Sequence, residues 1–366
     1  MKVINFGSTF ELYPDDLKTF DQLPVGTYKV RFNPMAGYSL ALTHDYIAIE
    51  GKTYGNHEER IEKTLRAYDA MSRSLGVILS GDKGMGKSLF TQILAVKAIE
   101  RGIPVIIVSE SYPMLADFLD KIEQEVLIIF DEFEKIFPKQ RSNDGNKNQT
   151  TQDDLLGLFD GTSQFKRIYA VTVNDLHKVN DYMMNRTGRF HYHIRFDYPT
   201  ADEIEIYLAD KVEEQYHNEI KHVVAFATRV KINYDSLRSI AFELNMGYPF
   251  KSAIRDLNIL TTSAQHYDYE ILLTNGKKVT DRNERMNLFD ESIRLTGYTP
   301  SGNYYSAIFE PKHLETHDGT LIIAGEHVEF DIQHEEDASD DEKSLQVQAI
   351  QIRKKIDRGV NYNLTV

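Results

Sequence analysis

The sequence has 366 residues, more than one compact domain usually holds, and 41% of them are hydrophobic, an ordinary share for a globular chain. It contains no cysteine, which excludes disulfides, thiolate metal sites and cysteine nucleophiles. Asp and Glu outnumber Lys and Arg by 56 to 42, and the formal charge of −14 argues against a protein whose whole surface coats nucleic acid.

The N-terminal residues, 1–53, predict a small β-rich unit. Residues 27–32 alternate as a strand, Asn33 and Pro34 break into a turn, and residues 38–42 return as a second strand. The first residues lack the apolar run of a signal peptide, and no stretch of the chain reaches eighteen consecutive apolar residues. We therefore expect a cytoplasmic protein with no membrane partner.

A phosphate-binding pattern follows a helix predicted over residues 57–71. The apolar run 76–80 predicts a buried strand, and the eight residues after it read G-x-x-x-x-G-K-[ST]. In such a loop the backbone N–H groups point at a triphosphate, and the helix predicted over residues 89–100 directs its positive end to the same place. The residues expected to hold the nucleotide are Asp82, Lys83, Gly84, Met85, Gly86, Lys87, Ser88 and Leu89. Lys87 adds a positive charge, and the Ser88 hydroxyl is expected to bind Mg²⁺.

A second buried strand, residues 125–130, ends in two carboxylates. Asp131 can reach the Mg²⁺ shell together with Ser88, and Glu132 is placed to polarise an attacking water. The polar run that follows, residues 139–152, cannot bury a core, so we expect a mobile loop there. It is a candidate to line a central channel, and its two Lys and one Arg are a weak indication of nucleic-acid binding.

A third strand, residues 167–173, ends at Asn174, whose amide can orient the attacking water. The alternative is that Asn174 caps the next helix. Farther along the chain, Arg186 and Arg189 lie three residues apart and can address one phosphate. Their alternative is a solvated pair beside a turn.

The rest of the chain changes character twice. Residues 200–264 are mostly helical and predict a lid, in which Arg255 can bring a cation over the nucleotide or can be an ordinary helix-face arginine. Residues 265–366 predict a β-rich region that contains a hairpin with an Asn275-Gly276 turn. The acidic run 335–342 reads as a solvated loop, with docking of a basic partner as the alternative.

In this order and spacing, residues 54–260 resemble the AAA+ ATPases, and more narrowly the core AAA clade, in which an R-x-G-R-F segment follows a sensor asparagine. The short connection before residues 125–130 and the segment 131–135 are similar to those of little-characterised AAA proteins of bacteria and bacteriophages. The resemblance implies Lys87 and Ser88 as the Walker A pair, Asp131 and Glu132 as the Walker B pair, Asn174 as the first sensor, Arg186 and Arg189 as arginine fingers, and Tyr54 and Gly55 near the adenine base.

The resemblance also implies the cofactors, the assembly and the fold. ATP and Mg²⁺ are the expected cofactors, and the chain is expected to form a homo-oligomer, usually a ring of six, because the arginine fingers act on the neighbouring subunit's nucleotide. The fold class is α/β, a P-loop parallel sheet flanked by helices with a helical lid, plus β-rich N- and C-terminal units. The expected domains are 1–53, 54–199, 200–264 and 265–366.

One segment departs from the family pattern. Fewer than twenty residues separate the strand predicted over residues 104–108 from the Walker B strand, where protein-threading members carry an aromatic-apolar-Gly pore loop and two helical stretches. A single helix, residues 115–123, is expected instead. Tyr112 or Met114 can face a central channel, or both can pack against the core.

Three functional hypotheses follow. The first is an ATP-hydrolysing ring that remodels a protein or a protein–nucleic-acid complex, whose substrate the sequence leaves open. The second is a helicase- or replication-loader-like factor that binds DNA directly, because loader ATPases also have a short connection before the Walker B strand. The third is a non-enzymatic scaffold that ATP stabilises, against which Glu132, Asn174 and the two arginines count.

Overall fold

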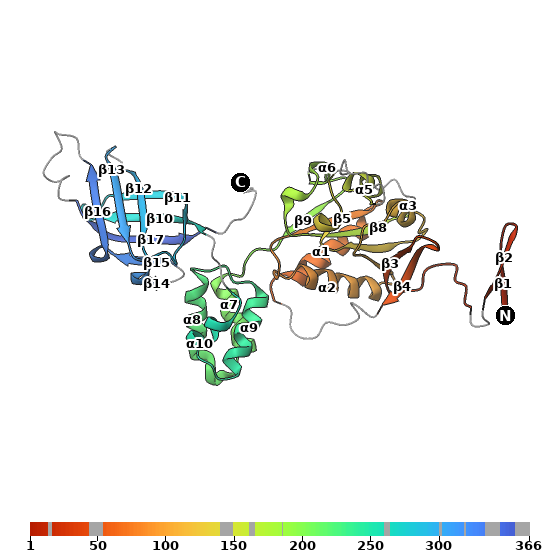
Figure 1. The fold of residues 1–366 in the computed structure, drawn as a ribbon, viewed down its shortest axis with the longest axis horizontal. Helices are drawn as coiled ribbons and strands as arrows, with labels where there is room; N and C mark the ends of the chain where they lie inside the picture. Colours follow the sequence, from red (N-terminus) through yellow and green to blue (C-terminus); the bar gives the residue numbers. More distant parts are fainter. Residues whose placement is uncertain are drawn as a thin grey trace. The chain divides into compact units, whose positions relative to one another are not determined.

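The computed structural model describes residues 1–13, 17–43, 54–139, 149–160, 165–184, 186–259, 264–299, 302–317, 320–333 and 345–355. The chain divides into two compact units, which we describe separately (Figure 1). The first comprises Met1–Asp82 and Gly86–Phe196, and the second comprises Lys83–Met85 and Asp197–Val366.

A seven-stranded sheet forms the centre of the first unit, in the order β4-β3-β6-β7-β8-β5-β9. Its neighbours run parallel except for the antiparallel pair β3 and β4. The central strands are buried along their whole length, as expected for a parallel sheet that helices cover on both faces. In chain order the strands are β3 (Thr27–Asn33), β4 (Gly37–Thr43), β5 (Leu75–Ser80), β6 (Val105–Val108), β7 (Val126–Phe130), β8 (Arg167–Val173) and β9 (Tyr192–Arg195).

Helices lie on both faces of this sheet (Figure 1). One face carries α1 (His57–Ala70) and α2 (Lys87–Glu100), and the other carries α3 (Leu115–Asp120), α5 (Gln152–Phe159) and α6 (Asp181–Met184). On the second face Leu119, Phe159 and Met183 pack in one hydrophobic core with apolar side chains of the strands. The predicted α/β class, a parallel sheet flanked by helices, is confirmed.

The N-terminal residues do not all lie outside this sheet. The strands β1 (Lys2–Phe6) and β2 (Thr9–Tyr13) form a separate two-stranded hairpin, whereas β3 pairs in parallel with β6. The strands that the sequence places in a unit of residues 1–53 thus extend the nucleotide-binding sheet. A parallel pairing across this much sequence depends on tertiary packing, which the local pattern does not contain.

The second unit begins with a helical part and continues as β-structure (Figure 1). The helices are α7 (Ala201–Lys211), α8 (Ile220–Ala227), α9 (Tyr234–Asn245) and α10 (Phe250–Asp256). Thr200 and Glu203 start α7 with a reciprocal capping box, and the Asn233 side chain caps α9. No helix in the described ranges is long and apolar enough to cross a membrane.

Two antiparallel sheets make up the C-terminal part, with strand orders β11-β10-β17-β15-β14 and β12-β13-β16. They share one hydrophobic core, and across it Tyr269 hydrogen-bonds Tyr305 with 2.8 Å between their hydroxyl oxygens. The Asn275-Gly276 turn joins β10 to β11, and Gly276 has a φ of 76°. The strands are β10 (Gln265–Leu273), β11 (Lys278–Met286), β12 (Ile293–Tyr298), β13 (Tyr304–Phe309), β14 (Glu315–His317), β15 (Thr320–Ala324), β16 (Val328–Gln333) and β17 (Val347–Lys354).

Candidate functional site

The strand order brings three predicted motifs to one edge of the first unit. The strands β7, β8 and β5 are consecutive neighbours and parallel, so their carboxyl ends meet at the same edge of the sheet. The Walker B pair follows β7, Asn174 follows β8, and the phosphate loop follows β5. This edge is where an open α/β sheet binds its ligands.

The phosphate loop is shaped by its glycines and by Lys87. Gly86 adopts a φ of 94° directly before α2 begins at Lys87, a conformation that favours glycine. The Lys87 side chain is buried, and its Nζ donates hydrogen bonds to the Gly81 and Asp82 carbonyl oxygens at 2.6 and 2.8 Å. Burial lowers the pKa of the Lys87 ammonium, and Asp82 and the Walker B carboxylates act in the opposite direction. The buried Lys87 ammonium is thus held inside the phosphate loop by two of the loop's own carbonyl groups.

The tip of this loop, Lys83–Met85, groups with the second unit. There Asn233 Nδ2 donates to the Lys83 carbonyl oxygen at 3.1 Å, and the Tyr234 N–H donates to the Gly84 carbonyl oxygen at 3.2 Å. A Cβ on Gly84 would lie 2.6 Å from Asn233 Nδ2 and 2.8 Å from Asp235 Oδ2, so these side chains would have to shift, and the φ of 79° at this position favours glycine. A capping signal at Asn233 is readable in the sequence, but its contact with the loop tip is not.

His57 is a residue at this edge that the motif search did not single out. Its ring stacks on Phe196 with centroids 5.5 Å apart and lies near Phe90 at 6.2 Å. A Cβ on Gly86 would meet the imidazole at 3.4 Å, so the ring packs against the phosphate loop. Tyr54 and Gly55, which the resemblance places near the adenine, directly precede this segment, and their contact with a nucleotide remains a prediction.

Thr172 on the neighbouring strand bonds both Walker B residues, Asp131 through its carboxylate and Glu132 through its backbone. The Thr172 hydroxyl donates to Asp131 Oδ1 at 2.7 Å and accepts from the Glu132 N–H at 2.8 Å. In the described part of the chain, Asp131 Oδ2 has no hydrogen-bond partner, and Ser88 is exposed in the first turn of α2. A carboxylate oxygen and a hydroxyl are the hard ligands that Mg²⁺ prefers, so these two residues fit the ion.

Glu132 occupies a strained position at the end of β7. Its φ of 48° lies in the left-handed region, which glutamate seldom adopts. The Lys135 ammonium, 2.5 Å from Glu132 Oε1, forms an ion pair with it. Strain of this kind concentrates at functional sites, which supports the assignment of Glu132 without testing it.

Asn174 is hydrogen-bonded to Glu134, two residues after the Walker B pair. Its backbone N–H and its side-chain Nδ2 both donate to Glu134 Oε1, at 3.0 and 3.1 Å. The alternative that Asn174 caps the next helix is wrong, because Asp175 accepts from the His177 N–H and is the cap. Glu134 was visible in the sequence only as a second acidic residue after Glu132.

The two candidate arginine fingers differ in exposure. Arg189 is 7% exposed, and its guanidinium pairs with both carboxylate oxygens of Asp160 and donates to the Tyr182 carbonyl oxygen at 2.8 Å. The Arg186 side chain is 61% exposed, with Nη1 3.9 Å from Asp160 Oδ1. The hydrogen bond from Arg189 holds the pKa of Asp160 below its usual value. Of the two arginines, Arg186 is therefore the one free to reach another molecule.

Other predicted residues lie elsewhere or outside the described ranges. Arg255 is exposed on α10 of the second unit. Tyr112 packs against Phe32 and Tyr38, whereas Met114 is 71% exposed with a φ of 60°. Most of the polar loop, residues 140–148, and the acidic run 335–342 lie outside the described residues.

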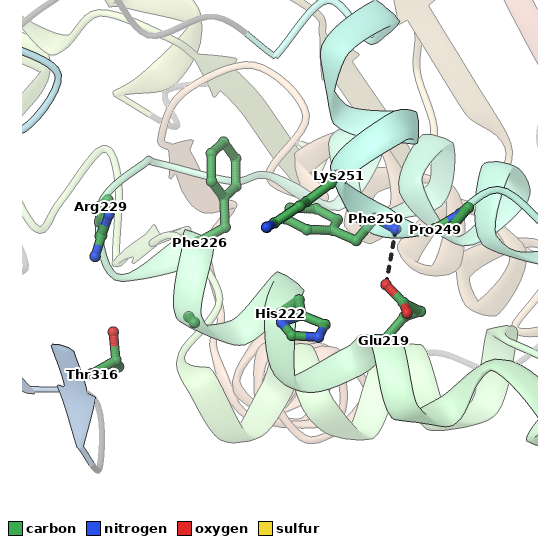
Figure 2. Close-up of a pocket in the computed structure, with 9 residues that line it drawn as sticks. Glu219, His222, Phe226, Arg229, Pro249, Phe250, Lys251 and Thr316 are labelled. Atoms are coloured by element: carbon green, nitrogen blue, oxygen red, sulfur yellow. Dashed lines mark hydrogen bonds between the residues drawn. The ribbon is translucent and has the colours of Figure 1, made fainter. Parts of the chain in front are cut away.

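A hollow of about 570 Å³ in the second unit is separate from these motifs (Figure 2). Phe226 and Phe250 pack edge to face there with ring centroids 5.5 Å apart. Glu219 Oε2 accepts the Phe250 N–H at 2.9 Å, so this carboxylate caps α10 (Figure 2). Its lining holds no residue of the phosphate-binding pattern.

The sheet, the phosphate loop and the acidic strand end define a P-loop nucleotide-binding domain. Residues 77–198 match the family model "ATPase family associated with various cellular activities (AAA)". A Dictyostelium discoideum protein named as a ribosome biogenesis ATPase, nvl, is 25% identical over a region that covers 35% of this chain and 16% of that protein. Both matches support an AAA+ P-loop ATPase domain in this part of the chain.

Proposed function

We propose that the chain hydrolyses ATP in a homo-oligomeric ring and uses the cycle to remodel a protein or a protein–nucleic-acid complex. The observation that carries this proposal is the meeting of the phosphate loop, Asp131, Glu132 and Asn174 at the ends of three adjacent strands. Nucleotide binding and ATPase activity are properties of the superfamily. The assembly and the remodelling are inferences from the site.

Each residue has a role in the proposed reaction. The loop N–H groups and Lys87 bind the phosphates, and Lys87 exchanges its bonds to the loop carbonyls for phosphate oxygens. Glu132 accepts a proton from the attacking water, which Asn174 orients. Mg²⁺, which Ser88 and Asp131 would hold, neutralises phosphate charge when it is bound with ATP.

The arginines explain why the site needs a second copy. Arg186 is exposed, whereas Arg189 is held by Asp160 within its own protomer. We assign Arg186 as the residue that reaches the γ-phosphate of a neighbouring copy, with Arg189 and Asp160 supporting its segment. An arginine supplied from a partner can raise phosphoryl transfer by about 10³-fold or more. A closed ring of such heterologous contacts, six in the usual family case, gives every site a donor.

Steady-state ATP hydrolysis tests the catalytic assignment. Glu132→Gln keeps the size of the side chain but removes the base, so we expect turnover to fall at least about 100-fold while nucleotide still binds. The matched control is Glu123→Gln, which changes an exposed carboxylate before β7 and should leave turnover unchanged. Equal turnover by wild type and Glu132→Gln would contradict the assignment.

The substrate class is tested by stimulation of turnover. The Dictyostelium relative is named for ribosome biogenesis, and a role on a nucleoprotein complex is compatible with the proposed remodelling. We expect no stimulation by naked single-stranded DNA at physiological salt, because the chain carries a formal charge of −14. Strong, salt-sensitive stimulation by that DNA would instead favour the loader-like function.

A further inference from the structure

Glu134 is a buried acidic side chain in the first unit that has no role in the reaction proposed above. It lies on the short helix α4 (Phe133–Ile136), is 9% exposed, and accepts both hydrogen bonds from Asn174 on its Oε1. Its Oε2 is buried and has no hydrogen-bond partner among the described residues. One carboxylate oxygen of Glu134 therefore bonds Asn174, and the other has no hydrogen bond among the described residues.

This arrangement is costly for a purely structural carboxylate. Burying an ionised group without full hydrogen bonding is unfavourable, and most buried polar atoms in proteins have partners. Two hydrogen bonds to the same oxygen compensate only part of that cost. Because unfavourable features of this kind concentrate at functional sites, an incompletely paired carboxylate where the motifs meet indicates a functional role rather than a structural one.

The chemistry of the carboxylate fixes the orientation of the Asn174 amide. A carboxylate oxygen accepts hydrogen bonds and cannot donate them, so the amide nitrogen of Asn174 must face Glu134. The amide oxygen Oδ1 is then turned away from Glu134. Since the Asn174 backbone N–H donates to the same Oε1, both the end of β8 and the side chain are held at once.

We propose that Glu134 is a positioning residue for hydrolysis: it holds Asn174 so that Oδ1 serves as the acceptor that orients the attacking water. This inference rests on the proposed ATPase function. An acceptor at that place draws a water hydrogen and leaves a water lone pair for attack, whereas a flipped amide presents N–H groups there. Glu134 acts through Asn174 and does not itself touch the reacting atoms.

The first test is a double-mutant cycle on the chain of 366 residues. We expect Glu134→Ala to lower kcat about 10- to 100-fold, as losses of supporting hydrogen bonds do, with KM and the Kd for a fluorescent ADP changed less than about threefold. Glu134→Gln retains a carbonyl oxygen that accepts both bonds, so it should stay within about threefold of wild type. In the Asn174→Ala background, Glu134→Ala should have no further effect on kcat.

A second pair of variants conserves side-chain size, so that the test still holds if the alanine variants misfold. Asn174→Asp alone sets two carboxylates against each other and should abolish turnover, whereas adding Glu134→Gln supplies an N–H donor and should recover turnover at least about 10-fold. Thermal unfolding of every variant checks that the fold is retained.

Two results would overturn the inference in different ways. If Glu134→Ala lowers kcat equally in the wild-type and Asn174→Ala backgrounds, or if the size-conserving pair shows no recovery, Glu134 does not act through Asn174. If the wild type has no turnover in any assembly state, the proposed function fails, and the role of Glu134 in hydrolysis fails with it.

Discussion

At the scale of single residues, the site is organised by side chains at the end of β8 that reach across to the end of β7. Thr172 lies on β8, and Asn174 directly follows the last residue of that strand. Thr172 contacts Asp131 and Glu132, and Asn174 contacts Glu134. Residues at the end of β8 thus hold the Asp131 carboxylate, the Glu132 backbone and the Glu134 carboxylate.

The role of Thr172 is testable by removing its hydroxyl alone. Thr172→Val keeps the buried shape but loses both hydrogen bonds, so Asp131 and the Glu132 backbone become less well oriented. We expect kcat to fall about 10- to 100-fold, as for other residues that orient metal ligands, with a smaller effect on the free energy of unfolding. Steady-state kinetics beside urea unfolding measures both.

A matched control for this change is Thr64→Val on α1. Thr64 is equally buried and donates only to the Arg60 carbonyl oxygen within its own helix. Its substitution should leave kcat unchanged. Equal losses of kcat in the two variants would show that Thr172 contributes to packing rather than to the site.

The Asp160 and Arg189 pair predicts a pH dependence of stability. Arg189 lowers the pKa of Asp160 in the folded state, so the stabilisation is present above the ordinary carboxyl pKa of about 4 and is lost as pH falls through the lower folded value. We expect Asp160→Asn to be less stable than wild type by about 1 kcal/mol at pH 7, because the pair is partly exposed, and by less near pH 3. Urea unfolding at both pH values measures the difference, and an equal difference at both would contradict the assignment.

At the scale of elements, the sequence predicted those structures that depend on residues close together in the chain. The phosphate loop, the buried strands and the Asn275-Gly276 hairpin follow from spacing and turn chemistry that the sequence states directly. The pairing of β3 with β6 was not predictable, because no local pattern encodes a parallel neighbour 78 residues away.

In the candidate site, too, only part could be predicted from the sequence. The motif residues follow from order and spacing, whereas the residues that contact and orient them do not. His57, Thr172 and Glu134 look like ordinary helix or strand residues in the sequence, and only the strand order places them beside the motifs. The different burial of Arg186 and Arg189 depends on Asp160, which approaches from α5 through tertiary packing.

Within the second unit, β17 contacts α8 through a half-buried lysine. Lys354 Nζ lies 3.4 Å from the Ala227 carbonyl oxygen, and burial, with a smaller effect of Lys231, lowers the pKa of Lys354 to about 7. The unfolded chain holds this proton up to about pH 10.4. Between these values the unfolded state binds more protons than the folded state, so stability rises with pH from 7 towards 10.

Replacing Lys354 removes this dependence. Lys354→Met keeps a long apolar side chain without the charge, so we expect it to be more stable than wild type at pH 7 and the advantage to shrink by pH 9.5. Chemical unfolding at the two pH values, followed by tyrosine fluorescence, measures it. An advantage that does not change with pH would mean that Lys354 stays charged in the fold. Lys355→Met, one residue further along the chain, is the control.

At the scale of the whole molecule, the central claim is that one chain completes the nucleotide site of another. The exposed arginine and the acidic strand end belong to the same unit, yet the proposed reaction needs Arg186 from a neighbouring copy. The claim therefore concerns the assembly, and variants that are defective in different parts of the site should complement each other.

The most direct measurement is ATP turnover by an equimolar mixture of Arg186→Ala and Glu132→Gln, assembled together, beside each variant alone. In a mixed ring about one interface in four joins an intact Glu132 to an intact Arg186, so turnover should recover to about a quarter of the wild-type value while each variant alone stays near zero. Turnover of the mixture no greater than the mean of the two variants would show that the arginine does not act between copies.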